Sequence, residues 1–194
     1  MSTNPGTPLP NPLPLIQING LPGVGKLTTA RALQFLLHSH SPSPHQLLSA
    51  RLVDNHLLID PADAVLQRTE PGYQALRRAL RSVVLDPIAE NPATHGHVYI
   101  FTDCQSDDPL GAATGVHVER VGAADRVARG GKLVDVTLLK GIRETTVIHR
   151  FTEEDVLGGT LELDVTRLSP EEAAVRIMQH VLDAHPELKT IIAE

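Results

Sequence analysis

A glycine-rich stretch near the amino terminus constrains the fold of this chain more than any other feature. It spans residues 20–26 with the sequence GLPGVGK, follows the apolar run at 15–18 and precedes a helical pattern that begins at Lys26. Glycines let backbone N–H groups turn inward around an anion, and the N-terminus of the following helix adds partial positive charge. The stretch therefore predicts a strand, a phosphate-binding loop and a helix in that order.

The loop and the start of its helix supply the predicted nucleotide-binding residues. We expect Lys26 to reach the β- and γ-phosphates of ATP, to be catalytic, and to face solvent when no ligand is bound. Such loops carry Ser or Thr after the lysine to hold Mg²⁺, but this chain has Leu27 and then Thr28. A glycine-rich turn that binds nothing is the alternative. The predicted binding residues are Gly20, Pro22, Gly23, Val24, Gly25, Lys26, Leu27 and Thr28.

The length, net charge and cysteine content of the chain limit the classes of protein to which it can belong. A chain of 194 residues fits one domain with a real core. The net charge of −6 argues against a protein built to coat nucleic acid or an anionic membrane. One cysteine, Cys104, excludes an internal disulfide and fits a reducing compartment. We therefore expect a cytoplasmic protein without a membrane span, with a proline-rich, disordered or extended lead-in at 1–14 and one domain at 15–194.

Short apolar runs alternate with helical patterns, which predicts an α/β fold with three layers and a five-stranded parallel sheet. The expected strands are residues 15–19, 50–53, 97–102, 133–139 and 161–165. The expected helices run from 26 to before 41, over 61–68 and 72–91, and from a capping box at 169–172 onward. The apolar face of the helix at 72–91 is expected to contain Tyr73, Leu76, Leu80, Val83 and Val84. The last helix is expected to bury Ala173, Val175, Ile177, Val181 and Leu182.

Polar residues follow the second predicted strand. Open α/β sheets bind ligands at the carboxyl ends of their strands, where Asp54, Asn55 and His56 lie. Asp54 is predicted to be catalytic, because a carboxylate there can orient an acceptor hydroxyl and take its proton. Asn55 and His56 would offer hydrogen bonds to the acceptor. The alternatives are that Asp54 caps the following turn and that His56 has a structural hydrogen bond.

The helix at 72–91 carries three arginines. Arg77, Arg78 and Arg81 lie mostly off its expected apolar face. We predict that Arg77 and Arg81 bind an anionic group of the acceptor substrate. The alternative is an ordinary solvated helix face.

The third predicted strand closes on Asp103 after an apolar run. An acid in this position holds Mg²⁺ directly or through water, so the predicted metal residues are Thr28 and Asp103, with Thr29 as an alternative to Thr28. Phosphoryl transfer also needs positive charge over the γ-phosphate in the transition state. Arg143 and, more strongly, Arg150 are the candidates on a short segment after the fourth strand, with a surface charge as the alternative. Arg150 is therefore predicted to be catalytic.

With these residues in place, the chain resembles the small P-loop kinases of the nucleoside monophosphate kinase-like group, within the P-loop containing nucleoside triphosphate hydrolase superfamily. It is similar to gluconate kinase, shikimate kinase and chloramphenicol phosphotransferase from residue 15 to the last helix. In gluconate kinase-like proteins an Asp that ends strand two, with a nearby His, lies at the acceptor, which implies the same for Asp54 and His56. Leu27 and the short segment before Arg150 depart from the group.

The expected function is ATP-dependent transfer of the γ-phosphate to a hydroxyl of a small metabolite, with ATP and Mg²⁺ as cofactors. One alternative is a nucleotide-binding protein with little or no kinase activity. A second is a nucleic-acid end kinase, which the negative net charge disfavours. We expect a small-molecule acceptor as the partner, and neither a membrane nor a nucleic acid.

Overall fold

The computed structural model describes residues 13–39, 49–104, 146–148, 150 and 159–193. In this part of the chain three strands form one parallel sheet in the order β1-β3-β2. The strands are β1 (Leu15–Asn19), β2 (Ser49–Leu52) and β3 (His97–Asp103). Leu15 pairs with Tyr99 and Asn19 with Asp103, so β1 and β3 end together at one edge of the sheet.

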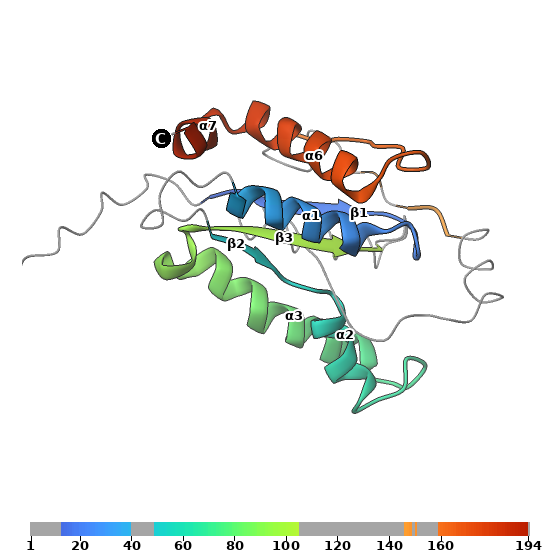
Figure 1. Ribbon diagram of the computed structural model, residues 1–194. Helices are drawn as coiled ribbons and strands as arrows, with labels where there is room; N and C mark the ends of the chain where they lie inside the picture. The colour runs from blue at the N-terminus through green and yellow to red at the C-terminus, as the bar shows by residue number, and fades with distance from the viewer. Residues whose placement is uncertain (1–12, 40–48, 105–145, 149, 151–158, 194) are drawn as a thin grey trace, which may run out of the picture.

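Helices cover both faces of the sheet and make a three-layer arrangement (Figure 1). On one side lie α1 (Lys26–Ser39), α6 (Pro170–Ala184) and α7 (Pro186–Ala193). On the other side lie α2 (His56–Asp63) and α3 (Tyr73–Glu90), followed by the short 3-10 helix η1 (Pro92–Thr94). The described residues therefore confirm the predicted α/β class and the parallel strands.

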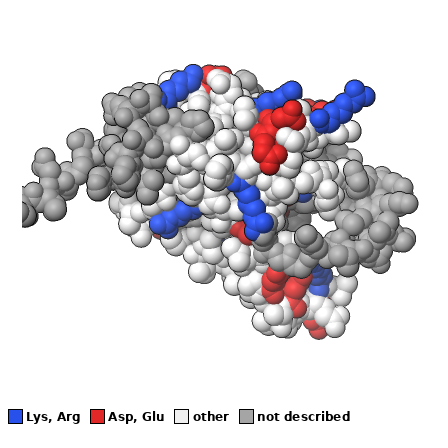
Figure 2. Space-filling view, in the orientation of Figure 1, with Lys and Arg blue, Asp and Glu red and all other residues white. Residues whose placement is uncertain are grey.

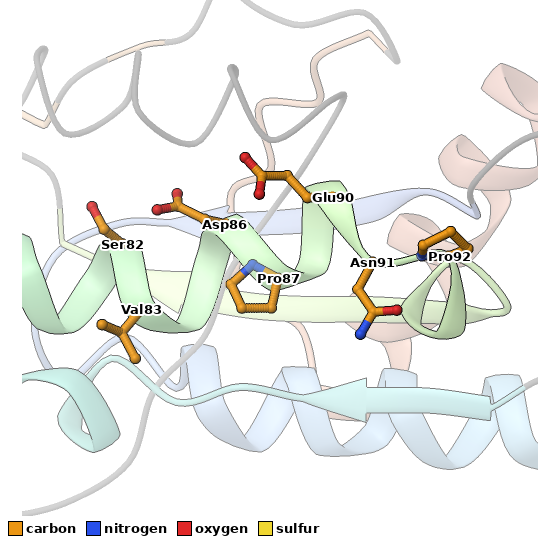
Figure 3. Close-up of a pocket in the computed structure, with 7 residues that line it drawn as sticks. All are labelled: Ser82, Val83, Asp86, Pro87, Glu90, Asn91 and Pro92. Atoms are coloured by element: carbon orange, nitrogen blue, oxygen red, sulfur yellow. The ribbon is translucent and has the colours of Figure 1, made fainter.

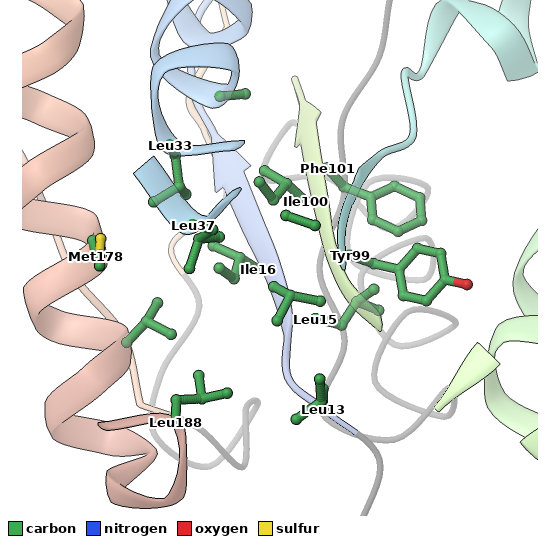
Figure 4. Close-up of a cluster of buried hydrophobic side chains, with 14 of the residues drawn as sticks. Leu13, Leu15, Ile16, Leu33, Leu37, Tyr99, Ile100, Phe101, Met178 and Leu188 are labelled. Atoms are coloured by element: carbon green, nitrogen blue, oxygen red, sulfur yellow. The ribbon is translucent and has the colours of Figure 1, made fainter. Parts of the chain in front are cut away.

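The core lies between the sheet and its two helical layers. Side chains alternate across a strand, so neighbouring residues face opposite layers. Figure 4 shows Ile16 on the side of Leu37 and Met178, whereas Tyr99 and Phe101 lie on the other side. Apolar contact on both faces explains why β3 reads as a continuous apolar run.

The strand predictions differ in outcome. β1 is confirmed to the residue, β2 begins and ends one residue earlier than expected, and β3 extends one residue further to Asp103. The strand expected at 133–139 lies outside the described residues. The strand expected at 161–165 is wrong, because this segment has no regular secondary structure and its side chains Leu161 and Glu162 are exposed. The described sheet has three strands, not five.

The helix expected at 61–68 begins earlier, as α2 at His56, and ends at Asp63. The prediction took Pro61 as the first helical residue, a position that proline favours. In the structure an oxygen of Asp54 accepts the backbone N–H of His56 at 3.0 Å, which satisfies a donor that the helix start leaves open. Asp54 thus caps the turn that leads into a helix beginning at His56, five residues before Pro61.

The bounds of α3 agree with the prediction within one residue, but its expected apolar face is confirmed only in part, because Tyr73 is buried, Leu76, Leu80 and Val84 are half-buried, and Val83 is exposed. Val83 is 72% exposed, whereas the buried residues are Tyr73, Arg81 and Leu85. Arg81 forms an ion pair with Asp103, so the helix face that carries Arg81 is buried although this residue is charged.

The last helix is confirmed together with its capping box. Ser169 Oγ accepts the N–H of Glu172 at 3.1 Å, and Glu172 accepts the N–H of Ser169 at 2.7 Å. Most of its expected buried face is confirmed, because Ala173 and Val181 are buried and Ile177 and Leu182 pack against the core. Val175 is exposed instead, and Ala174 and Met178 are buried in addition. Within the described segments, no helix combines the length and apolar character that crossing a bilayer requires.

Candidate functional site

The loop between β1 and α1 has the backbone conformation that its glycines were predicted to allow. Gly23 and Gly25 adopt φ angles of 80° and 85°, in the left-handed region that side chains disfavour. The first helical hydrogen bond runs from the N–H of Thr29 to the carbonyl of Gly25 at 3.0 Å. The loop therefore opens directly onto the N-terminus of a 14-residue helix.

Lys26 is not solvent-facing, which corrects the sequence-based expectation. Its Nζ donates to the carbonyl oxygens of Gly20 at 2.7 Å and Leu21 at 2.8 Å. Burial lowers the pKa of Lys26, and the nearby Cys104 and Asp103 oppose that shift. The ammonium group is therefore hydrogen-bonded to the backbone of its own loop.

The three residues after Lys26 differ in how far they are buried. Leu27 is partly buried and packs against the hydrophobic core, Thr28 is exposed, and Thr29 is buried. Leu27 thus contributes to packing and offers no oxygen ligand.

Asp103 lies beside the loop, as its place at the end of β3 predicted. It is in register with Asn19, the last residue of β1, and its carbonyl accepts the N–H of Gly20 at 3.3 Å. Its carboxylate is buried.

A buried polar triangle surrounds that carboxylate. Arg81 donates to Asp103 Oδ2 at 2.5 Å and to Asn55 Oδ1 at 2.6 Å. Asn55 in turn donates its amide to Asp103 Oδ1, which also accepts the backbone N–H of Cys104 at 2.8 Å. The triangle joins α3, the end of β2 and the end of β3.

Sequence reasoning missed this triangle because it placed Arg81 off the apolar face of its helix and predicted an anionic group of the acceptor, not Asp103, as its partner. The sequence signal that could have predicted the triangle is the four-residue spacing of residues that share one face of α3. Tyr73, Arg77, Arg81 and Leu85 lie on one stripe of α3, and two of them are plainly core residues.

Asp54 shares this edge of the sheet with Asp103. It is two residues beyond the end of β2, where Leu52 pairs with Ile100. One of its oxygens accepts the His56 N–H, and Oδ2 is buried without a hydrogen-bond partner among the described residues. Burial raises the pKa of Asp54 to about 6, against the opposing effect of the His56 N–H.

The other predicted acceptor residues are placed differently from one another. His56 is half-buried, and its Nδ1 lies 3.0 Å from Asp60 on the same helix. Asn55 is buried within the triangle. The Arg77 guanidinium lies 6.0 Å from the centre of the Tyr73 ring, and its buried Nε has no hydrogen-bond partner in the described structure. Burial and the neighbouring Arg81 lower the pKa of Arg77.

Arg150 pairs with Glu162 at 2.9 Å, and both side chains are exposed. This is the alternative that the sequence left open, a surface charge. Arg143 lies outside the described residues. The structure thus brings Lys26, Asp103, Asn55 and Arg81 together at one edge of the sheet, and it places Arg150 on the surface.

Elsewhere in the described part of the chain, the charged residues and the depression on α3 indicate no competing site. Lys and Arg are interspersed with Asp and Glu over the described part of the face in Figure 2. A depression of about 600 Å³ runs along the second half of α3 (Figure 3). Its lining residues are Ser82, Val83, Asp86, Pro87, Glu90, Asn91 and Pro92. These residues lead into the start of β3, so the depression lies toward the opposite end of the strands from Asp103.

Comparison with known protein families, with curated proteins and with solved structures found no match for this chain. The residues at the carboxyl edge of the sheet are therefore the basis for proposing what it does.

Proposed function

We propose that the protein is an ATP-dependent phosphotransferase that moves the γ-phosphate to a hydroxyl of a small metabolite. One observation carries the proposal. A glycine loop that opens onto a helix N-terminus, with Lys26 at its end, shares one edge of a parallel sheet with the poorly solvated Asp54 carboxylate. The backbone N–H groups of the loop can bind phosphates, and the carboxylate can accept the proton of a hydroxyl group.

The roles of the residues follow from their contacts. The loop amides would bind the phosphates, and Lys26 would exchange its bonds to the Gly20 and Leu21 carbonyls for bonds to phosphate oxygens. Asp54 would accept the proton of the acceptor hydroxyl, whose oxygen bonds to the γ-phosphorus while the bond to ADP breaks. His56 and Arg77 remain the proposed acceptor contacts, whereas Arg150, which pairs with Glu162 on the surface, is assigned no role in the transfer. Arg81 and Asn55, which are buried, position the site.

A second candidate is a protein that binds nucleotide with little or no transfer. The observation in its favour is that two key groups are already engaged. Lys26 is bound to its own loop, and the Asp103 carboxylate is bound to Arg81 and Asn55.

Single-turnover transfer from γ-labelled ATP into pools of sugars, nucleosides and hydroxy acids separates the two candidates. We expect Asp54→Asn to bind ATP as the wild type does but to transfer roughly 10²-fold more slowly, the usual scale for a lost positioned base. Asp183→Asn, at an exposed carboxylate on α6, is the matched control and should transfer normally. ATP binding without transfer to any pool favours the second candidate. A wild-type rate in Asp54→Asn contradicts the assigned base.

A further inference from the structure

Among the described residues, those near the loop do not fit a resident Mg²⁺ ion. Mg²⁺ requires oxygen ligands in near-octahedral geometry. Leu27 supplies no oxygen and packs against the core. Thr28 lies one residue further along α1, which turns its hydroxyl about 100° from the direction of residue 27. Asp103 is the one predicted metal ligand whose carboxylate lies beside the loop.

The Asp103 carboxylate is already neutralised and hydrogen-bonded. Its two oxygens accept bonds from the Arg81 guanidinium, the Asn55 amide and the Cys104 backbone N–H. Arg81 and Asp103 are only 5% and 3% exposed, so this is a buried ion pair shielded from water.

A divalent cation that bound Oδ2 of Asp103 directly would compete with Arg81 for that oxygen. The displaced guanidinium would then be a buried charge without its partner, which is strongly unfavourable. Arg77 adds a second positive charge next to Arg81, and Asn55 fixes the guanidinium through a bond of 2.6 Å. Arg81 therefore occupies the position, relative to the carboxylate, that a metal would take.

We infer that Arg81 is a built-in cation that closes the Asp103 carboxylate to divalent metal, and that the loop at 20–25 binds a polyphosphate without a metal ligand from Asp103. The part that concerns polyphosphate rests on the proposed function. The part that concerns Asp103 and Arg81 stands on the contacts of these two residues alone.

The first arm of the test measures ATP affinity by calorimetry in the wild type, with excess Mg²⁺ and with a chelator. We expect the two dissociation constants to agree within about threefold, because the protein adds no carboxylate to the metal. Binding that is tenfold or more tighter with Mg²⁺ would overturn the inference.

The second arm needs no nucleotide. Mn²⁺ is titrated into the free protein, and paramagnetic broadening of the Cys104 backbone amide signal is followed by NMR. We expect no selective broadening in the wild type or in Arg78→Gln, a control at an exposed arginine of the same helix. We expect clear broadening in Arg81→Gln, in which Asp103 has lost its cation.

The outcomes separate the inference from the proposed function. Selective broadening in the wild type, or none in a folded Arg81→Gln, contradicts the inference. Absence of ATP binding in every protein contradicts the proposed function, and the Mn²⁺ titration still decides the role of Arg81. If thermal melting shows that Arg81→Gln is unfolded, the two wild-type measurements decide it.

Discussion

At the scale of single residues, the two carboxylate oxygens of Asp54 lie in different environments. One oxygen starts α2 through the His56 N–H, and the other is buried without a hydrogen-bond partner among the described residues. The folded state therefore binds a proton at this carboxyl more tightly than the unfolded chain does, and the pKa rises to about 6. A group of this kind stabilises the fold below its unfolded pKa, and that stabilisation is lost as the pH rises through about 6.

Because the ionised form of Asp54 destabilises the fold at neutral pH, we predict that Asp54→Asn stabilises the protein there. The amide keeps the oxygen that accepts the His56 N–H and removes the buried charge. We expect the free energy of unfolding to rise by up to about 3 kcal/mol at pH 7.5 and to be unchanged near pH 3.5, because the pKa is raised by about two units and each unit is worth about 1.4 kcal/mol. Urea unfolding at the two pH values measures it. A variant that is less stable than the wild type at pH 7.5 contradicts the assignment of Asp54 as a strained carboxylate.

At the scale of elements, α3 determines where Arg81 lies. Its buried stripe repeats every four residues and places Leu85, which is fully buried, one turn after Arg81. The hydrophobic contact of Leu85 with the core thus fixes the same helix rotation that holds Arg81 against Asp103.

Two substitutions on α3 test this rotation. We expect Leu85→Ala to reduce the free energy of unfolding by about 2–5 kcal/mol, the range for leucine truncation in a core. Val83→Ala, at the exposed position that the sequence assigned to the core, should change it by less than about 0.5 kcal/mol. Chemical unfolding of both variants gives the comparison. The opposite ranking would restore the face expected from the sequence.

At the scale of the whole molecule, one sheet edge gathers the loop, Asp54 and Asp103 from three separate parts of the chain. β1, β3, α1 and α6 could be predicted because local signals define them: short apolar runs, a glycine loop and a capping box. The buried stripe of α3 could not, because Arg81 was predicted to bind the acceptor substrate and its partner in the structure, Asp103, is 22 residues away in sequence. Lys26 was misplaced for a similar reason, since loop carbonyls attract it in the absence of ligand.

The central claim is that the loop at 20–25 and Lys26 bind the phosphates of ATP, and calorimetric titration of ATP tests it most directly. The titration compares the wild type with Lys26→Ala and with Lys189→Ala, a control at an exposed lysine on α7, and thermal melting checks that each protein is folded. We predict that Lys26→Ala weakens ATP binding by at least about tenfold, because a charge-assisted bond to phosphate is lost, and that Lys189→Ala binds as the wild type does. Equal affinity in a folded Lys26→Ala protein, or no measurable binding by the wild type, would contradict the claim.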